Sequence, residues 1–249
     1  MSDTISISAM DLILAATLVL LLAGVTTRAG FGSGQLTLIA AARMSIQLLL
    51  VGLILKSLFT NASLWRTAGV ALVMLLVAGR ETIARQQRRF VGPWGYGLGT
   101  FTVFLSSFAV TLLALAAFIG PQPWYAPRYA IPLLGMIMGS TMSGVALALD
   151  SLTRLAWQQR GLIEARLMLG HSHDAAIADI RQQSMHSGLI PIVSAMAAAG
   201  IVSLPGMMTG QILAGNPPME AVKYQILIMF SIAAATGFGT LAAVWLGAR

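Results

Sequence analysis

Residues 224–248 read YQILIMFSIAAATGFGTLAAVWLGA, a stretch of 25 residues without a charged side chain. Lys223 and Arg249 bound this stretch, so charges occur only at its two ends. An α-helix needs about 20 mostly apolar residues to cross the hydrocarbon core of a bilayer. The pattern therefore predicts a membrane-spanning helix over residues 223–247.

Working outward from this helix, the few charges of the chain outline further apolar stretches. Only 9% of the residues are charged, against about 25% in soluble domains, which excludes a lone soluble domain. We predict an all-α, polytopic membrane helix bundle in which residues 1–249 form a single transmembrane domain. The third span is the shortest, and its helix is expected to be able to continue out of the bilayer. The seven expected spans are 8–27, 36–58, 64–80, 98–119, 129–149, 189–213 and 223–247.

The distribution of basic residues predicts the orientation of the chain. Of the 15 basic residues, ten fall on the inner side if the N-terminus is outside, four fall on the outer side, and Arg43 lies within a span. Basic residues accumulate in cytoplasmic loops, so we expect N-out and C-in. The first ten residues include Asp3 but no basic residue, so a signal peptide is not indicated and the first span should be retained. The basic excess thus reflects membrane topology rather than nucleic-acid binding.

The only long polar segment, residues 150–188, is predicted to form a cytoplasmic helix–turn–helix. Gly170 is expected to end the first helix over residues 151–169, and Ser172 to cap a second helix that runs to about residue 187. A shorter polar segment follows the third span, where Glu81 and Arg85 have the i,i+4 spacing of a helical ion pair.

The spacing within this polar segment resembles the coupling motif of ABC-transporter permeases, which docks in a cleft of the ATPase. Two positions depart from the motif, because Arg166 replaces an alanine and Gln182–Gln183 replaces the final Leu-Pro. An amphipathic surface helix pair is the alternative interpretation. The four matching positions are Glu164, Ala165, Gly170 and Ile180.

A second resemblance covers nearly the whole chain. Residues 203–215 read SLPGMMTGQILAG and residues 220–226 read EAVKYQI, and these strings resemble the FetB-type permeases, an ABC permease family associated with iron export in bacteria. The resemblance extends upstream to Arg43, Gln47, Arg80 and Glu81. It implies a permease subunit of the bacterial inner membrane that pairs with an ABC ATP-binding subunit and a second copy of itself. Arg80 and Glu81 join the four motif positions as expected ATPase-coupling residues.

The chain itself carries no motif for ATP hydrolysis. It lacks the Gly-x-x-x-x-Gly-Lys-Ser/Thr string of P-loop ATPases, and its only lysines are Lys56 and Lys223. Its lack of cysteine excludes disulfides and iron–sulfur clusters. We therefore expect a transport subunit rather than an enzyme, with no cofactor of its own. ATP would act through the partner subunit, and the remaining contacts would be with membrane lipid.

The Pro205–Gly206 break in the sixth expected span is the candidate substrate path. Proline removes a backbone donor, and broken helices in membrane proteins often line substrate sites. The alternative is a kinked helix whose methionines fill packing gaps. Arg43 and Gln47 share one face of the second span, and a gating role there competes with snorkelling to the membrane surface. The candidate path residues are Ser203, Pro205, Gly206, Met207, Met208, Thr209, Gln211, Arg43 and Gln47.

Four residues are candidate metal ligands: Met207, Met208, Glu81 and Asp150. The two acids lie nearest the inner membrane surface and are expected more often to cap helices or pair with arginine. Thioethers favour soft metals, and iron(II) is borderline. Two further groups contain possible metal ligands but are interpreted differently. The methionines of the fifth span (Met136, Met138, Met142) are expected to pack between helices. The cluster of His171, His173 and Asp174 is expected to be a solvated turn.

The leading hypothesis is the permease of an ABC exporter for iron or a related metal. One alternative is an ABC permease for an organic solute such as a nucleotide sugar. Another is a self-contained secondary transporter, although no acid lies deep in any expected span. A retinal protein is rejected because Lys223 lies at the edge of its span. An intramembrane hydrolase is not indicated because all three histidines fall in the polar segment.

Overall fold

The computed structural model describes residues 8–30, 32, 34–60, 63–84, 86, 94–120, 123 and 125–249. In this part of the chain every long element is a helix, which confirms the predicted all-α fold class. The chain forms two compact units, Met1–Asn61 and Ala62–Arg249, which are described separately. The helices are α1 (Ala9–Arg28), α2 (Gly34–Thr60), α3 (Leu64–Ala84), α4 (Trp94–Leu113) with its π-helical continuation η1 (Ala114–Ile119), α5 (Pro127–Gln158), α6 (Arg160–Met168), α7 (His173–Ala176), α8 (Ala178–Ala198), α9 (Gly206–Leu213) and α10 (Pro218–Gly247).

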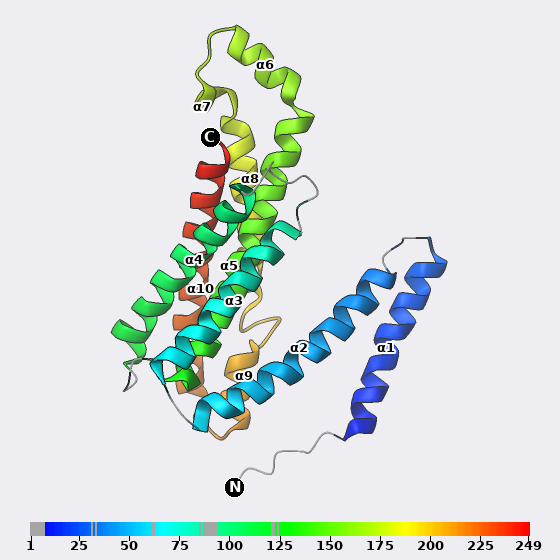
Figure 1. Cartoon of the computed structure of the whole chain (residues 1–249), viewed down its shortest axis with the longest axis vertical. Coiled ribbons are helices and arrows are strands. Elements are labelled where there is room, and N and C mark those ends of the chain that lie inside the picture. The colour runs from blue at the N-terminus through cyan, green and yellow to red at the C-terminus, as the bar shows by residue number, and fades with distance from the viewer. Residues whose placement is uncertain are drawn as a thin grey trace. The chain divides into compact units, whose positions relative to one another are not determined.

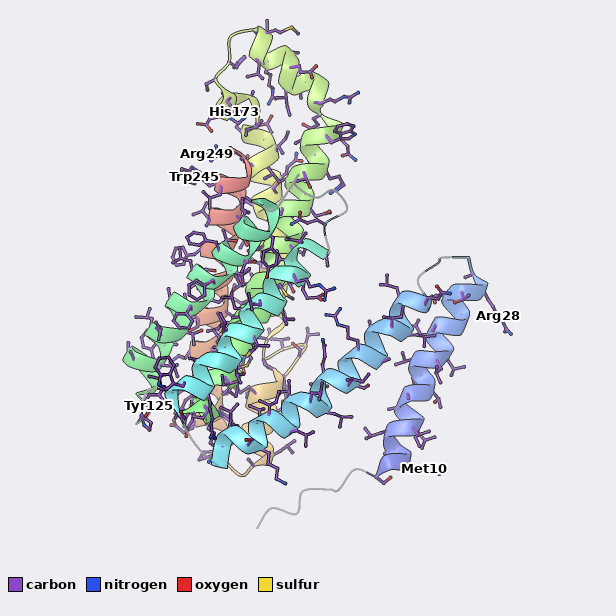
Figure 2. The ribbon with its side chains drawn as sticks, viewed as in Figure 1. Met10, Arg28, Tyr125, His173, Trp245 and Arg249 are labelled. Carbon is purple, nitrogen blue, oxygen red and sulfur yellow. The ribbon has the colours of Figure 1, made fainter. Side chains whose placement is uncertain are left out.

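The first unit is a pair of apolar helices, α1 and α2. Ser8 and Asp11 form a capping box that starts α1, which ends at Arg28; Figure 2 labels Met10 and Arg28 near its two ends. Large side chains point outward on all sides, and Leu36 and Leu49 are 75% and 73% exposed. A helix that is apolar all round is typical of a membrane span. Both helices are long and apolar enough to cross a bilayer.

In the second unit, α3, α4, α5, α8 and α10 pack around two buried apolar clusters. Val103, Val145 and Leu149 are fully buried in its main cluster. Five buried hydroxyls are satisfied within their own helices, since each donates to the carbonyl oxygen four residues earlier at 2.6–2.9 Å. These hydroxyls belong to Thr82, Thr102, Ser106, Thr111 and Ser184. The buried hydroxyls of Ser107, Thr141, Thr236 and Thr240 make no hydrogen bond within the described residues.

Small residues let the helices of this unit approach closely, as expected for helices packed in lipid. At Gly144 an added Cβ would lie 2.6 Å from Thr236 Cγ2 and 2.9 Å from the carbonyl oxygen of Gly188. Gly135 is tight as well, since its Cβ would lie 3.3 Å from the Met74 methyl group. Gly139 faces open space. The fifth span is therefore closely packed at Gly144 and Gly135 but not at Gly139.

Within the described residues, six helical stretches are long and apolar enough to span a membrane: α1, α2, α3, α4 together with η1, α5 and α10. The sixth expected span, residues 189–213, is not among these six stretches. The expected break is present, but the helix ends earlier than the Pro205–Gly206 pair predicted. Helix α8 ends at Ala198, and Ala199 and Pro205 have extended backbone conformations before α9 begins at Gly206. Pro205 has no N–H to donate back into a helix, which accounts for the break just before α9. The third helix continues beyond residue 80 to Ala84, as the short third span allowed.

The segment formed by α8 and α9 nevertheless runs back along most of α5. At one end, Ser187 Oγ of α8 donates to Ser151 Oγ near the C-terminus of α5, at 3.4 Å. At the other end, Met207 of α9 lines a cavity together with Tyr129 of the first turn of α5. Figure 1 shows α6 and α7 beyond the C-terminal end of α5, and α9 toward its N-terminal end. We name these the α6 end and the α9 end. Helices α8 and α9, with the break between them, connect the two ends.

In the polar segment at the α6 end, the turn and the helix cap lie where the sequence predicted them. The predicted helix boundaries, in contrast, are wrong. Gly170 has φ +86° after α6, and the Ser172 hydroxyl accepts from the Ala175 N–H at 3.3 Å, so the expected stop and cap are confirmed. The first predicted helix, 151–169, is instead the end of α5 followed by α6, with non-helical Gln159 between them. The second is interrupted at Ile177, where α7 gives way to α8.

Candidate functional site

A cavity of about 420 Å³ lies at the α9 end, between the first turns of α5 and α10 and one face of α9. Helix α9 starts after Pro205, whose carbonyl oxygen accepts from the Thr209 hydroxyl at 3.2 Å. We call this space the α9 cavity. Its walls are Arg128, Tyr129, Pro132, Leu133 and Met136 of α5, Met207 and Gln211 of α9, and Asn216, Pro217, Glu220, Tyr224 and Ile228 in and before α10.

Two of the sequence-predicted path residues, Met207 and Gln211, line the α9 cavity. They are four residues apart, which places them on the same face of α9. The neighbouring candidates have other positions. Ser203 is exposed in the break, where its hydroxyl donates to the Ala198 carbonyl at 3.4 Å. Met208 is half-buried on another side of α9. The Thr209 hydroxyl donates to the Pro205 carbonyl, one turn earlier.

Several residues of the α9 cavity were not singled out from the sequence. Arg128 and Tyr129 lie at the start of α5, and Glu220 and Tyr224 lie in the first two turns of α10. In the sequence they look like ordinary residues at the ends of spans, where tyrosine and basic residues are common. Met136, interpreted as packing, also reaches this space. Only the tertiary fold brings them to one place.

The chemistry of the α9 cavity is mixed. Two thioethers, the Glu220 carboxylate and the Gln211 amide provide donor atoms for a cation. The Lys223 ammonium contacts Glu220 at 2.8 Å, so this carboxylate already has one exposed cationic neighbour. The Arg128 guanidinium instead suits an anionic group. The cavity can therefore take a metal ion held by soft and neutral donors, or an organic molecule that carries an acidic group.

The four candidate metal ligands do not form one site. Asp150 lies fourteen residues after Met136 on α5, which corresponds to about 21 Å along the helix axis. Glu81 lies near the end of α3, beyond Ala78, which packs in the same core cluster as Leu149. Both acids thus lie toward the α6 end, away from Met207. Among the described residues there is no group of three or more His, Asp or Glu side chains that could hold a metal.

Arg43 and Gln47 lie on α2, in the first unit, four residues apart on one helix face. Both side chains are exposed within that unit. The α9 cavity is formed entirely by the second unit. The predicted gating role of these two residues stays a prediction.

Some of the residues expected to couple to the ATPase are exposed, and others are buried. Glu164 is exposed on α6 and Ala165 is half-buried, whereas Ile180 is buried at the start of α8. Arg166 replaces the alanine of the coupling motif. Its guanidinium connects α6 with α7 and the start of α8. It contacts the Asp179 carboxylate at 2.7 Å and donates to the Ala176 carbonyl at 3.1 Å. Arg80 and Glu81 lie near the end of α3, and Arg85, the expected partner of Glu81, lies outside the described residues.

A second ion pair supports the same segment. Arg181 contacts Asp174 at 3.0 Å, and both residues lie between Ser172 and the second turn of α8. The histidines of the turn, His171 and His173, are exposed, in line with the interpretation of a solvated turn. Figure 2 labels His173 near Trp245 and Arg249, with Tyr125 at the opposite end of this unit.

The described part of the chain thus has six helices able to span a membrane, a broken α8–α9 segment and a cavity beside the break, as in a multi-pass membrane protein of permease type. Residues 9–249 match the model of the uncharacterised protein family UPF0014, and the chain belongs to this family. No solved structure matches the chain.

Curated relatives extend over most of the chain. A UPF0014 membrane protein of Synechocystis is 38% identical over 84% of this chain and 80% of its own length. The probable iron export permease protein FetB of Escherichia coli is 31% identical over 84% of this chain and 79% of its own length. The UPF0014 membrane protein STAR2 of rice is also 31% identical, over 84% of this chain and 71% of its own length. The resemblance to FetB-type permeases drawn from residues 203–226 is thus confirmed.

Proposed function

We propose that this chain is the membrane permease subunit of an ABC transporter that exports iron or a related metal ion. A separate ATP-binding subunit would supply the energy, because these 249 residues contain no P-loop. Membership of the family and the similarity to the probable iron export permease of E. coli support this proposal. The proposal also includes an inner-membrane location, the N-out and C-in orientation, and a second copy of the chain in the complex.

The observation that carries the proposal is the exposed apolar tip of the segment at the α6 end. Met168 and Leu169 are 83% and 79% exposed, just before the Gly170 turn. Asp150, Arg154 and Arg160 precede them, so this tip lies beyond the apolar part of α5. Exposed apolar side chains in a polar segment outside the bilayer mark a protein interaction site. The tip therefore fits a cleft on a soluble partner, as the coupling-motif resemblance implies.

The α9 cavity supports a role in recognising the substrate. It lies beside a break in a crossing, where free backbone groups can meet a solute or water. The thioethers of Met136 and Met207 and the Glu220 carboxylate favour a metal ion. The positive charge of Arg128 favours the second candidate, an organic anion, which two tyrosine rings could also contact.

The proposal is tested by affinity purification of the tagged chain from its native membrane in mild detergent. We expect a P-loop ATPase to co-purify and its activity to rise when it is bound to this chain. The double variant Met168→Asp with Leu169→Asp should release the ATPase. Gln158→Asp, which adds a charge at an exposed polar position on the same side, should retain it. Transport that survives ATP depletion, with no ATPase recovered, would reject the ABC assignment.

A further inference from the structure

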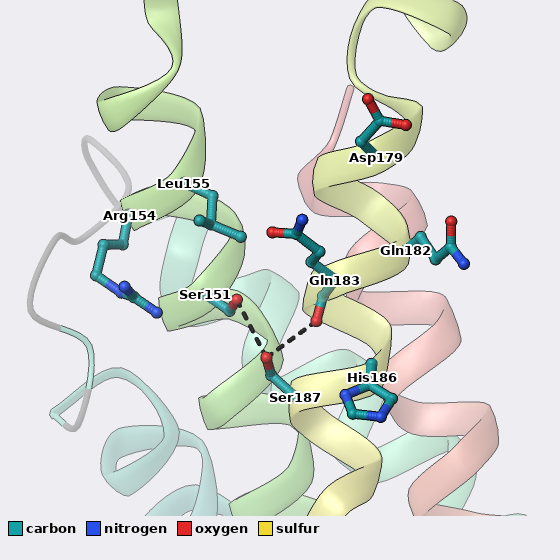
Figure 3. A pocket seen from close by; sticks show the side chains of 8 residues that line it. All are labelled: Ser151, Arg154, Leu155, Asp179, Gln182, Gln183, His186 and Ser187. Atoms are coloured by element: carbon teal, nitrogen blue, oxygen red, sulfur yellow. Dashed lines mark hydrogen bonds between the residues drawn. The ribbon is translucent and has the colours of Figure 1, made fainter.

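A polar cavity of about 620 Å³ separates the end of α5 from the beginning of α8 (Figure 3). We call it the α5–α8 cavity. It lies at the base of the α6–α7 segment, and the two helices that form its walls are those that enter and leave that segment. Its lining residues are Ser151, Arg154, Leu155, Asp179, Gln182, Gln183, His186 and Ser187.

Some polar side chains of this cavity have hydrogen-bond or ion-pair partners, and others have none among the described residues. Ser187 Oγ donates to the Gln183 carbonyl at 2.9 Å and to Ser151 Oγ at 3.4 Å. Asp179 is neutralised by Arg166 at 2.7 Å. Within the described part of the chain, Arg154 and His186 make no hydrogen bond or ion pair. The uncompensated charge of the cavity is therefore positive, and hydrogen-bond donors surround it.

The depth of these two residues corresponds to the phosphate layer of a bilayer. Arg154 follows the last uncharged residue of the fifth span, Leu149, by five residues, or about 7 Å along the helix. His186 precedes Leu189, the first residue of the apolar part of α8, by three residues, or about 5 Å. The headgroup layer is about 5–8 Å thick on each side of the hydrocarbon core. With the boundary of the hydrocarbon core expected at Leu149, both side chains are expected at the depth of the lipid phosphates, on two neighbouring helices.

A marker of the same membrane surface lies on α10. The Arg249 guanidinium stacks 3.6 Å from the centre of the Trp245 ring, and tryptophan is enriched at membrane–water boundaries. Leu246, next to Trp245, packs against the same core cluster as Leu152 and Leu155. Figure 2 labels Trp245 and Arg249 near His173, at the α6 end of the bundle where Arg154 also lies.

We propose that the α5–α8 cavity binds a phosphate group, supplied by the head group of an anionic membrane lipid. The Arg154 guanidinium would pair with the phosphate oxygens from α5, while the His186 ring and the Gln183 amide would donate from α8. Figure 3 shows the Gln183 side chain extending from α8 toward α5. Such a ligand bridges the two helices that carry the α6–α7 segment and fixes their separation. This inference depends on a membrane surface at this depth and not on the identity of the ATPase or substrate.

The test uses the full-length protein in nanodiscs of phosphatidylcholine, with and without phosphatidylglycerol. Native mass spectrometry counts the phosphatidylglycerol molecules that stay bound, and thermal unfolding reports the stabilisation that they provide. Wild-type protein should retain phosphatidylglycerol and melt at a higher temperature in its presence. Arg154→Gln should weaken retention about tenfold, the loss expected for one charge-assisted hydrogen bond. Arg160→Gln removes the same charge outside the cavity and should behave as wild type.

Two further results would overturn the proposal. If Arg154→Gln and Arg160→Gln lose the lipid equally, binding is a general charge effect and the cavity is not its site. If inorganic phosphate in pure phosphatidylcholine nanodiscs gives the full wild-type stabilisation, a soluble phosphate compound, and not a lipid, occupies the cavity. Neither readout involves transport or ATP hydrolysis, so failure of this inference is distinguishable from failure of the proposed function.

Discussion

Gly144 on α5 and Gly188 on α8 approach each other through their backbones. A Cβ added to Gly188 would lie 2.7 Å from the Gly144 carbonyl oxygen, and one added to Gly144 would lie 2.9 Å from the Gly188 carbonyl oxygen. Thr240 of α10 packs over the same point, since its Cγ2 would lie 2.6 Å from the Cβ of Gly188. Three helices therefore meet where only glycine fits at two of the positions.

This contact predicts that Gly188→Ala destabilises the bundle. A methyl group there meets backbone and side-chain atoms of two neighbouring helices, and such overpacking costs about 1–3 kcal/mol. For a chain of this size the melting temperature should fall by about 2–4 °C for each kcal/mol. Gly139→Ala on α5 adds the same methyl group to open space and is the control. Equal melting temperatures for the two variants in detergent would show that α5 and α8 are not so closely packed.

The α9 cavity predicts different roles for two adjacent methionines. Met207 lines the cavity and Met208 does not appear among its walls. Met207→Ala should lower iron(II) uptake by inside-out vesicles about fivefold, the factor that ~1 kcal/mol of lost substrate contact produces. Met208→Ala should have little effect, and both variants should be expressed normally. The double variant should resemble Met207→Ala; normal transport by it would remove this cavity from the substrate path.

The two candidate acids at the α6 end predict a negative result. Asp150 lies about 21 Å along α5 from Met136, too far to share a ligand with the α9 cavity. Asp150→Asn should therefore leave the affinity of the detergent-solubilised protein for iron(II) unchanged, as measured by calorimetry. Glu220→Gln, which removes the one carboxylate of the cavity, should weaken that affinity. The reverse pattern would move the metal site to the α6 end.

The Arg166–Asp179 pair predicts an effect on coupling rather than on stability. Asp179 is 61% exposed, so solvent screens the pair and its contribution to folding is at most about 1 kcal/mol. Arg166 also holds the Ala176 carbonyl, and so it fixes α6 against the α7 turn. Arg166→Glu should abolish stimulation of the partner ATPase with little change in melting temperature. Combining it with Asp179→Arg should restore part of the stimulation; no recovery would mean that the ion pair itself does not position the segment.

The spans were predictable because charge is excluded from the hydrocarbon core. The run between Lys223 and Arg249 became α10, and the Gly170 turn and Ser172 cap followed from local backbone chemistry. The break before α9 was only partly predictable. Pro205 predicted a break at this point. However, the helix already ends six residues earlier, at Ala199, where neither a charged residue nor a proline predicts its end.

The composition of the candidate site could not be read from the sequence. Arg128 and Glu220 are more than ninety residues apart in the chain and meet only because α5 and α10 begin at the same end of the bundle. Each occupies a position that is ordinary for the end of a span. Met207 and Gln211 were accessible to prediction because the Pro205–Gly206 break drew attention to the residues that follow it.

The buried hydroxyls of the second unit affect how its helices can move. Thr82, Thr102 and Ser184 each donate to a carbonyl of their own helix, so these hydrogen bonds do not tie one helix to another. Neighbouring helices can change their crossing angle while every one of these bonds remains intact. For the transport role proposed above, this means that the helices can rearrange without breaking these polar bonds in the core.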